Sequence, residues 1–350
     1  MLDNSLPSTV HIIGSFNDLA QPYLIQQYPR SIIICDHHTQ HIAIKLSILT
    51  TEATIVIPAG ETSKSRHTKA WLEDQWLRLG LCRHDLIIAC GGGMILDLVG
   101  FTAATYLRGI DCLYCPTSLL AMVDASLGGK TAINACDVKN ALGVFSNPKY
   151  TLIVMETLQT LPWVEKRNGI IECYKHFFLT DEKYSLHLLN NHDPIETFLN
   201  YHNADNIKQQ LEIKQSFVRA DPYDHNRRQM LNLGHTLGHA IESIYHVPHG
   251  VGVALGLHFI AHVSAELFNF PQEHVHAITQ AWQRLNIKPP SNMCSDLLIN
   301  ACMNDKKRQS STLTWVLLHD FGQPFLHSLS ISQSKHFIHH WIKNHAYSLS

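Results

Sequence analysis

Short apolar runs rich in β-branched residues alternate with helical patterns over about the first 155 residues of the chain. Strand-like runs occur at 9–13, 31–36, 53–58, 85–90, 112–115 and 151–155, and a helical pattern spans 63–80. Strands that alternate with helices are typical of a parallel sheet with helices on its faces. The sequence therefore predicts an α/β N-terminal domain with a Rossmann-like, mostly parallel sheet.

The pattern changes after the segment LPW at 161–163. Helical periodicity appears at 164–180, 205–220, 226–246, 250–268, 274–285 and 332–345, and 312–318 is the only segment there that we expect to be a strand. We expect an α/β domain over 1–160 and a mostly α-helical domain over 161–350. Ligands commonly bind between domains, so the cleft between these two is the expected site.

The composition favours a small ligand over a large charged partner. The chain has 350 residues, of which 45% are hydrophobic and 16% charged, with a formal net charge of −2 and no polybasic run. This argues against nucleic acid or a membrane surface as the main partner. We expect no apolar run that approaches the roughly 20 residues of a membrane span, and the start MLDNSLPSTV lacks a signal-peptide pattern, so we expect a cytoplasmic protein.

The chain has nine cysteines and 25 histidines, and we expect most of them to be ordinary core or surface residues without a role in catalysis or metal binding. The cysteines are scattered through apolar runs, as reduced core thiols are. Cys112 and Cys115 form a C-x-x-C on a predicted strand, where they would point to opposite faces rather than form a redox pair. His258 and His262 are expected to be surface or packing residues, although they are four residues apart like a metal-binding pair.

A glycine-rich turn, CGGGMILDLVG at 90–100, follows a predicted strand and enters a predicted helix. Gly91, Gly92 and Gly93 would let the backbone approach a pyrophosphate closely, and the amides at the helix start would bind its charge. The pattern departs from G-x-G-x-x-G because Leu96 stands where the last glycine would be. A tight turn without a ligand would have the same sequence.

Two further segments support a nucleotide at this turn. PAGETSK at 58–64 places Gly60, Glu61 and Lys64 in a loop that leaves a strand, and Asp36 ends another strand. An acid at a strand end can accept hydrogen bonds from ribose hydroxyls and would repel a 2′-phosphate. We therefore expect NAD, in a variant arrangement because Asp36 precedes the glycine turn.

The segment LNLGHTLGHA at 231–240 places His235 and His239 four residues apart. Residues at this spacing share a helix face, which permits a metal clamp without requiring one, and two core histidines are the alternative. Gly234 and Gly238 would each cost about 1 kcal/mol in a helix interior. We expect backbone or ligand to pass close to them.

Several long motifs together resemble the 3-dehydroquinate synthase family over nearly the whole chain. They are GGGMILDLVGFTAATYLRG, CPTSLLAMVDASLGGKTAIN, KNALGVF, IIECYKH, LNLGHTLGHA and NDKKRQ. The resemblance implies the dehydroquinate synthase-like fold and an NAD- and divalent-metal-dependent lyase (zinc or cobalt), usually a homodimer. It also implies conversion of 3-deoxy-D-arabino-heptulosonate 7-phosphate to 3-dehydroquinate and phosphate in the shikimate pathway to chorismate and the aromatic amino acids.

The implied route is transient oxidation of a substrate hydroxyl, phosphate elimination, re-reduction, ring opening and aldol closure. The substrate's own phosphate would take the proton during elimination. By the same resemblance Glu172, His235 and His249 are the metal ligands, and His239 contacts substrate or phosphate. A catalytic zinc with three protein ligands keeps open positions for an alkoxide oxygen.

The resemblance also assigns the remaining site residues. A phosphorylated keto-acid sugar needs several cations in one place. The residues expected at the substrate are Lys130, Lys139, Lys175, Lys214, Arg228, Lys306, Asn140 and Asn232, and Lys130, Lys139 and Asn140 are also expected near the cofactor. Asp97 and Asp124 would flank cofactor and substrate, Thr117 and Ser118 the nicotinamide side, and Arg108 the phosphate site of a neighbouring subunit.

Some positions depart from the family pattern. Leu96 and Val164 replace a glycine and an arginine, Val251 and Gly252 replace Glu-Ala after the His-Gly pair, and 221–229 lacks the usual acids and glycine. The leucine could crowd the cofactor turn, and the lost glutamate could weaken support for the metal.

Three other functions remain open from the sequence. A related sugar-phosphate cyclase that makes a cyclitol, such as 2-deoxy-scyllo-inosose or an epi-valiolone, would keep NAD and the metal. A metal-dependent polyol dehydrogenase would form NADH in net amounts and would not need so many cations. An inactive protein that keeps the fold for binding is the non-enzyme alternative.

Overall fold

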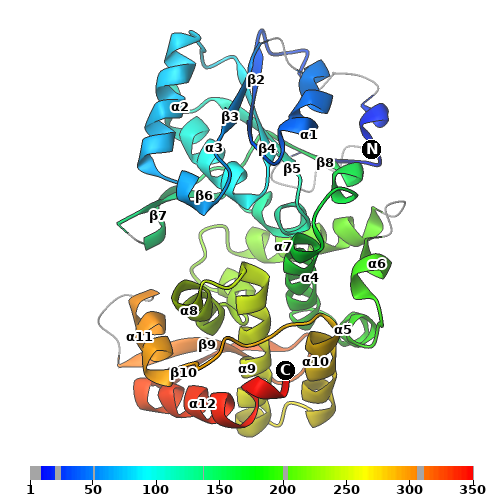
Figure 1. The fold of residues 1–350 in the computed structure, drawn as a ribbon, viewed down its shortest axis with the longest axis vertical. Helices are drawn as coiled ribbons and strands as arrows, with labels where there is room; N and C mark the ends of the chain where they lie inside the picture. The colour runs from blue at the N-terminus through cyan, green and yellow to red at the C-terminus, as the bar shows by residue number, and fades with distance from the viewer. Residues whose placement is uncertain are drawn as a thin grey trace. The chain divides into compact units, whose positions relative to one another are not determined.

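The computed structural model describes residues 9–19, 25–49, 52–136, 138–199, 204–305 and 311–349. The chain forms two compact units (Figure 1). The first comprises residues 1–166 and 199–215, and the second comprises residues 167–198 and 216–350. The division of tasks expected from the sequence, an NAD domain over 1–160 and a metal and substrate domain over 161–350, stays a prediction.

A six-stranded sheet forms the centre of the first unit. Its strands are β1 (Thr9–Ile13), β2 (Ser31–Asp36), β3 (Thr54–Ile57), β4 (Leu86–Gly91), β5 (Asp111–Pro116) and β8 (Tyr150–Val154). They run in the order β1-β8-β5-β4-β2-β3, and every paired neighbour is parallel. The predicted parallel α/β sheet is confirmed.

Helices cover both faces of this sheet (Figure 1). One hydrophobic cluster packs α2 (Arg66–Arg78) and α3 (Gly93–Thr105) on one face, and a second packs α1 (Gln40–Lys45) on the other. Burial on both faces explains why the strands appear as continuous apolar runs. Cys112 belongs to the first cluster and Cys115 to the second, so this C-x-x-C is a pair of core thiols as predicted.

An antiparallel hairpin, β6 (Lys130–Ala135) and β7 (Val138–Phe145), lies outside the main sheet. Seven of the eight β7 residues are exposed and one is half-buried. A strand with no buried face has no reason to alternate apolar and polar residues, and the sequence pattern accordingly gave no sign of it.

The second unit is mostly helical, as predicted. Helices of this part of the chain are α4 (Trp163–Phe178), α5 (Glu182–Leu189), α6 (Pro194–Phe198), α7 (Asp205–Ala220), α8 (His235–Tyr245), α9 (His249–Phe268), α10 (Gln272–Arg284), α11 (Ser295–Asp305) and α12 (Ile331–Asn344). The first residues of α4 and most of α7 belong to the first unit.

Two expectations for this half are wrong. The segment 226–246 is two elements, a 3₁₀ helix at Arg227–Asn232 and α8, because Gly234 takes a left-handed backbone angle (φ 75°) that interrupts the helix. The strand β9 (Thr312–Leu318) is not alone, because β10 (Pro324–Ser330) pairs with it antiparallel. The sequence PFLHSLS carries a proline and two serines, which hid its strand character.

Helix α9 corrects the expectation that no apolar run approaches the length of a membrane span. It has 20 residues and a mean hydropathy of 1.6, which is long and apolar enough by these criteria. However, 72% of that apolar window is buried inside the protein. A core helix that is apolar on all sides has the same composition as a membrane span, and α9 packs as a core helix.

Four glycines bring the backbones of α8 and α9 into direct contact. A Cβ at Gly256 would lie 1.8 Å from the carbonyl oxygen of Gly234, one at Gly252 would lie 2.7 Å from that of Gly238, and one at Gly238 would lie 2.9 Å from that of Gly252. The expectation that something passes close to Gly234 and Gly238 is confirmed, and what passes is main chain.

We predict that Gly256→Ala destabilises the second unit. The added methyl group meets a carbonyl oxygen that belongs to backbone and cannot rotate away, so α8 and α9 must separate. We expect a loss of about 3 kcal/mol or more, measured as a fall in Tm of roughly 5 °C or more. Gly93→Ala in α3 is the control, because its Cβ would meet only Ala125 at an ordinary 3.5 Å. Equal Tm values for the two variants would contradict the prediction.

Candidate active site

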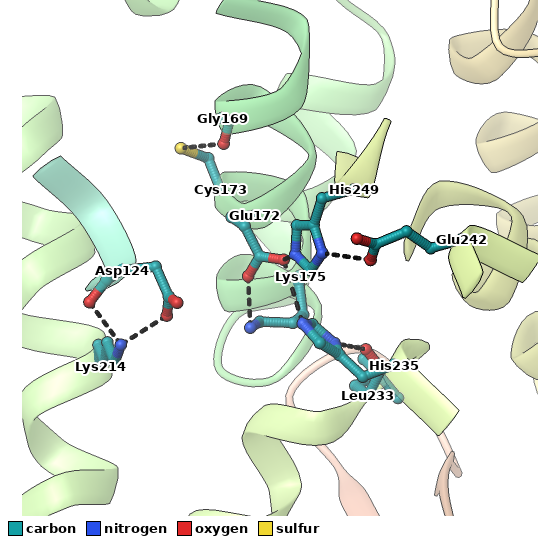
Figure 2. A network of polar contacts seen from close by, with 10 residues as sticks. All are labelled: Asp124, Gly169, Glu172, Cys173, Lys175, Lys214, Leu233, His235, Glu242 and His249. Atoms are coloured by element: carbon teal, nitrogen blue, oxygen red, sulfur yellow. Dashed lines mark hydrogen bonds and ion pairs between the residues drawn. The ribbon is translucent and has the colours of Figure 1, made fainter. Parts of the chain in front are cut away.

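Three side chains from three helices converge in the second unit. Glu172 comes from the middle of α4, while His235 and His249 are the first residues of α8 and α9. Both imidazole Nε2 atoms face Glu172 Oε1, at 3.3 Å from His235 and 3.5 Å from His249 (Figure 2). Two ligands of one tetrahedral zinc are about 3.3 Å apart, so these three groups fit a shared divalent ion.

Glu172 has no solvent exposure, and neither carboxylate oxygen accepts a hydrogen bond of normal geometry. Its charge is balanced by Lys175, one turn along α4, whose Nζ contacts Oε2. Burial alone would raise the pKa of Glu172, but the charges of Lys175 and His235 hold it well below its usual range. A buried carboxylate with unsatisfied oxygens beside two imidazoles is typical of a metal site.

Each of the two histidines has its second ring nitrogen fixed. Nδ1 of His235 lies 3.0 Å from the carbonyl oxygen of Leu233, and Nδ1 of His249 lies 3.1 Å from Oε2 of Glu242 (Figure 2). A carbonyl and a carboxylate can only accept, so Nδ1 carries a hydrogen in both rings and Nε2 is the nitrogen left to bind a metal.

The pKa values of the two histidines move in opposite directions. Burial and the nearby charge of Lys175 lower the pKa of His235 to about 4. Burial also lowers the pKa of His249, but its contacts with the carboxylates of Glu172 and Glu242 outweigh that effect and raise the pKa to about 9. Two causes separate the histidines: the carboxylate of Glu242 acts on His249 and has no counterpart at His235, and the charge of Lys175 acts on His235.

His239 lies beside these ligands but is solvent-exposed. Its ring centroid is 5.2 Å from that of His235 and 5.9 Å from that of His249. Among the described residues, no possible metal-binding group contains both His239 and Glu172. A ring nitrogen of His239 does lie close to a carboxylate oxygen of Glu242 and a ring nitrogen of His249. His246 is exposed at the end of α8, so the structure does not place it among the candidate ligands.

Glu242 is a site residue that sequence reasoning missed. A weak signal was present, because Glu242 follows His235 and His239 at i+7 and i+4 and so shares their helix face. The expectation that the replaced glutamate at 251 would support His249 does not fit the fold. Val251 is buried two residues along α9, on another side of the helix from His249.

Two other predicted substrate residues of this unit lie in the 3₁₀ helix that precedes α8. Arg228 is almost fully buried, and its Nη1 donates to the carbonyl oxygen of Pro222 at 2.7 Å. Asn232 is half-buried at the end of the 3₁₀ helix that precedes α8. Lys306 lies outside the described residues.

Val164, where the sequence departs from the family pattern, lies in the first turn of α4 and is 42% exposed.

In the first unit, the glycine turn joins β4 to α3. Gly91 is required by packing, because a Cβ there would lie 2.6 Å from Ile95. Gly92 and Gly93 are not, because a Cβ would meet Ser118 Oγ at 3.6 Å and Ala125 at 3.5 Å, which are ordinary contacts. The space beside these two glycines is therefore available to a ligand. Leu96 does not crowd it, because its side chain is fully buried in the cluster between α3 and the sheet.

Several predicted cofactor residues form one polar network near this turn. Lys64 Nζ contacts Asp97 Oδ2 at 2.5 Å and also Asn140 Oδ1. Asn134 accepts from the Asn140 backbone at 2.9 Å and donates to Glu61 at 2.8 Å. Burial raises the pKa of Asp97, and the charge of Lys64 partly opposes that shift. The network joins the loop after β3, helix α3 and the hairpin.

The other predicted cofactor residues lie at the carboxyl ends of the strands. Asp36 ends β2, and its Oδ1 accepts from the backbone and hydroxyl of Thr39, both at 2.9 Å. Thr117 follows β5 and donates its backbone N–H to Gly91 at 3.0 Å, and Ser118 Oγ accepts from Ala121 at 3.3 Å. Gly60 precedes the turn that holds Glu61. The carboxyl edge of a parallel sheet is where such folds bind nucleotides.

A buried lysine in α7 forms another lysine–aspartate ion pair in the first unit. Lys214 Nζ donates to Asp124 Oδ1 at 2.6 Å and to its backbone carbonyl at 2.5 Å (Figure 2). Lys130 on β6 and Lys139 on β7 are exposed, as is Arg108. The structure thus forms the two lysine–aspartate pairs in the first unit and the Glu172 group in the second. The roles of the exposed cations stay predictions.

We predict that the metal depends on His235 and not on His239. His235→Ala removes one of three ligands and should lower the affinity for Co²⁺ by more than about 100-fold, whereas His239→Ala should change it by less than about threefold. Cobalt titration followed by visible absorption measures both. Equal affinity in the two variants would show that the ligand assignment is wrong.

Comparison with known proteins identifies the family of this chain. The family model described as 3-dehydroquinate synthase N-terminal matches residues 54–168, and the C-terminal model of the same enzyme matches residues 169–308. The 3-dehydroquinate synthase of Oceanobacillus iheyensis is 36% identical over 324 residues (89% of each chain), and that of Pyrococcus furiosus is 41% identical over 272 residues (77% of this chain, 79% of the relative).

A solved structure supports the same fold at lower identity. The 2-epi-5-epi-valiolone synthase of Streptomyces hygroscopicus subsp. jinggangensis 5008, with NAD⁺ and Zn²⁺ bound, matches with a TM-score of 0.86 at 21% identity over 97% of both chains. The expected dehydroquinate synthase-like fold is confirmed. Because the family models match most of the sequence, and relatives above 30% identity cover most of it, this chain belongs to the 3-dehydroquinate synthase family.

Proposed function

We propose that this protein is an enzyme that converts 3-deoxy-D-arabino-heptulosonate 7-phosphate to 3-dehydroquinate and phosphate. The observation that carries the proposal is the convergence of His235 and His249 on the buried carboxylate of Glu172, in a chain of this family. The reaction would place the protein in the shikimate pathway, in the cytoplasm, with a small anionic substrate as its ligand.

Glu172, His235 and His249 would hold a divalent ion, zinc or cobalt. When bound, such an ion acts as a Lewis acid on a substrate oxygen. The protein's own part is to present three fixed ligand atoms, two of them on imidazoles whose tautomer is set by Leu233 and Glu242. Fixed ligands lose little entropy when the substrate binds.

Three buried lysines would bind anionic ligands: Lys64 the cofactor, and Lys175 and Lys214 the substrate. Lys64, Lys175 and Lys214 are 5%, 2% and 6% exposed, and each is neutralised by a carboxylate. A buried ammonium group without a counter-charge costs several kcal/mol, so these pairs keep the cations in place before the substrate arrives. Once Glu172 coordinates an ion, Lys175 needs another anion, which a carboxylate or phosphate of the substrate can supply.

NAD⁺ fits the first unit for two reasons. Gly92 and Gly93 leave space beside the start of α3 that the protein's own packing does not use, and backbone amides at a helix start bind phosphate. Asp36 stands at the carboxyl edge of the sheet, where a carboxylate can bind ribose hydroxyls. When bound, the nicotinamide supplies reversible hydride transfer.

A cyclitol-forming cyclase is the second candidate, because the valiolone synthase shares the fold. Its identity of 21% is well below the 36% and 41% of the two dehydroquinate synthases. Asn140, Lys214, Arg228, Asn232 and His239 also keep the pattern expected for a carboxylate-bearing substrate. The dehydroquinate function is therefore preferred.

We predict phosphate release without net NADH. The purified protein, given NAD⁺, Co²⁺ or Zn²⁺ and the heptulosonate phosphate, should release one phosphate per substrate while absorbance at 340 nm stays flat, because the cofactor is restored in each turnover. A chelator should abolish the release, and added metal should restore it. Sustained NADH formation would instead support a polyol dehydrogenase, and turnover of a sugar phosphate without a carboxylate would support a cyclitol cyclase.

We further infer that the enzyme is a homodimer that pairs through the β6–β7 hairpin. Val138 and Val144 on β7 are 57% and 38% exposed, and in the described part of the chain β7 pairs only with β6. Antiparallel pairing of β7 with its copy has twofold symmetry and would cover both. Arg108 and residues 146–147, just after β7, line one cavity of about 600 Å³, so the arginine expected to act on the neighbouring subunit lies near this edge.

We predict that Val144→Lys converts the dimer to a monomer, because each subunit would place an ammonium group among the side chains that the strand pairing covers. Light scattering measures the mass, and turnover should fall with it if Arg108 acts in the neighbouring subunit. Val164→Lys is the control, since this valine is similarly exposed (42%) on α4. A dimer of unchanged mass in Val144→Lys would place the interface elsewhere.

A further inference from the structure

We infer that Glu242 positions His249 for metal binding, and that Gly252 makes this contact possible. The inference rests on the proposed metal site and extends it to a residue outside the three expected ligands. Glu242 lies in the third turn of α8, seven residues before His249, which begins the next helix, α9. Its Oε2 accepts the hydrogen bond from His249 Nδ1 at 3.1 Å.

The hydrogen bond fixes the ring of His249 in the state that a metal needs. With its hydrogen held on Nδ1 by the carboxylate, the imidazole presents Nε2 to the ion, at 3.5 Å from Glu172 Oε1. A carboxylate partner also makes the imidazole a stronger donor than a carbonyl partner does. His235 has only the carbonyl of Leu233, so Glu242 makes the two histidine ligands unequal.

The electrostatic surroundings of Glu242 also favour this contact with His249. His249 is the first residue of α9, where the helix carries partial positive charge. A carboxylate is favoured there, and Glu242 has 16% side-chain exposure, so water screens its contact only partly. The ring of His249 is therefore held from one side by Glu172 and from the other by Glu242.

Gly252 connects this contact to a departure from the family pattern. A Cβ at position 252 would lie 3.4 Å from the Cβ of Glu242 and 2.7 Å from the carbonyl oxygen of Gly238. Glycine therefore lets α8 lie close enough to α9 for the Glu242 side chain to reach the ring. The carboxylate beside His249 therefore comes from α8.

A second arrangement competes with this one. The ligand atoms of His239, Glu242 and His249 lie within 4.8 Å of one another, so Glu242 could instead be a direct ligand of a second ion. The observed hydrogen bond favours positioning, because it leaves the proton on His249 Nδ1 where a second ion would need a lone pair. The two possibilities differ in metal stoichiometry.

The test compares Glu242→Gln and Glu242→Ala with the wild-type protein in cobalt titrations. Glutamine keeps an acceptor of the same shape but loses the charge, so we expect affinity to fall about 10-fold, and about 100-fold for alanine. One ion per chain should bind in all three, with a changed visible cobalt spectrum in the variants and a nearly unchanged Tm of the metal-free protein. Glu212→Ala, an exposed carboxylate on α7, is the control.

Each other outcome overturns the inference. Unchanged affinity in Glu242→Gln and Glu242→Ala would show that the contact does not support the metal. Two ions in the wild-type protein, with only the weaker one lost in Glu242→Ala, would make Glu242 a ligand. If the wild-type protein binds no cobalt at all, the proposed function fails together with the inference, whereas wild-type turnover with unaffected variants removes the inference alone.

Discussion

The arrangement of α4, α8 and α9 in the second unit depends on the carboxylate of Glu172, which has no solvent exposure. Removing an isolated carboxylate from water costs several kcal/mol, so Glu172 is compatible with folding only if positive charge stays beside it. Lys175 supplies that charge from the same helix, and the two imidazoles approach from α8 and α9. The three helices are thus joined by one electrostatic requirement, which either an ammonium group or a divalent ion can meet.

The sequence predicted the main sheet and most helices because their burial is simple. Strands buried on both faces appear as continuous β-branched runs, and core helices keep their periodicity. The hairpin strand β7 was missed since it has no buried face, and the helix over 226–246 was predicted too long because the effect of Gly234 depends on a backbone angle. In each case the deciding contact lies outside the local sequence.

In the candidate site, too, the local sequence predicted some features and tertiary contacts decided the others. Spacing alone could not separate His235 and His239 from His258 and His262, which are also four residues apart. In the structure His258 is a buried packing residue that accepts a hydrogen bond from Trp341, whereas His235 faces Glu172. The three metal ligands were predicted from the family resemblance. Glu242 was missed because its partner, His249, belongs to the next helix.

Main-chain contact between α8 and α9 has a consequence for ion selection. Two of the ligands begin these helices, so the opening between their imidazoles is set by backbone atoms that neither compress nor change rotamer. An ion with bonds of about 2.0–2.1 Å, such as zinc, fits that opening. Calcium, with bonds of about 2.3–2.6 Å and a demand for more oxygens, would have to force the helices apart. The glycines therefore make ionic radius a criterion of selectivity, without any additional side chain.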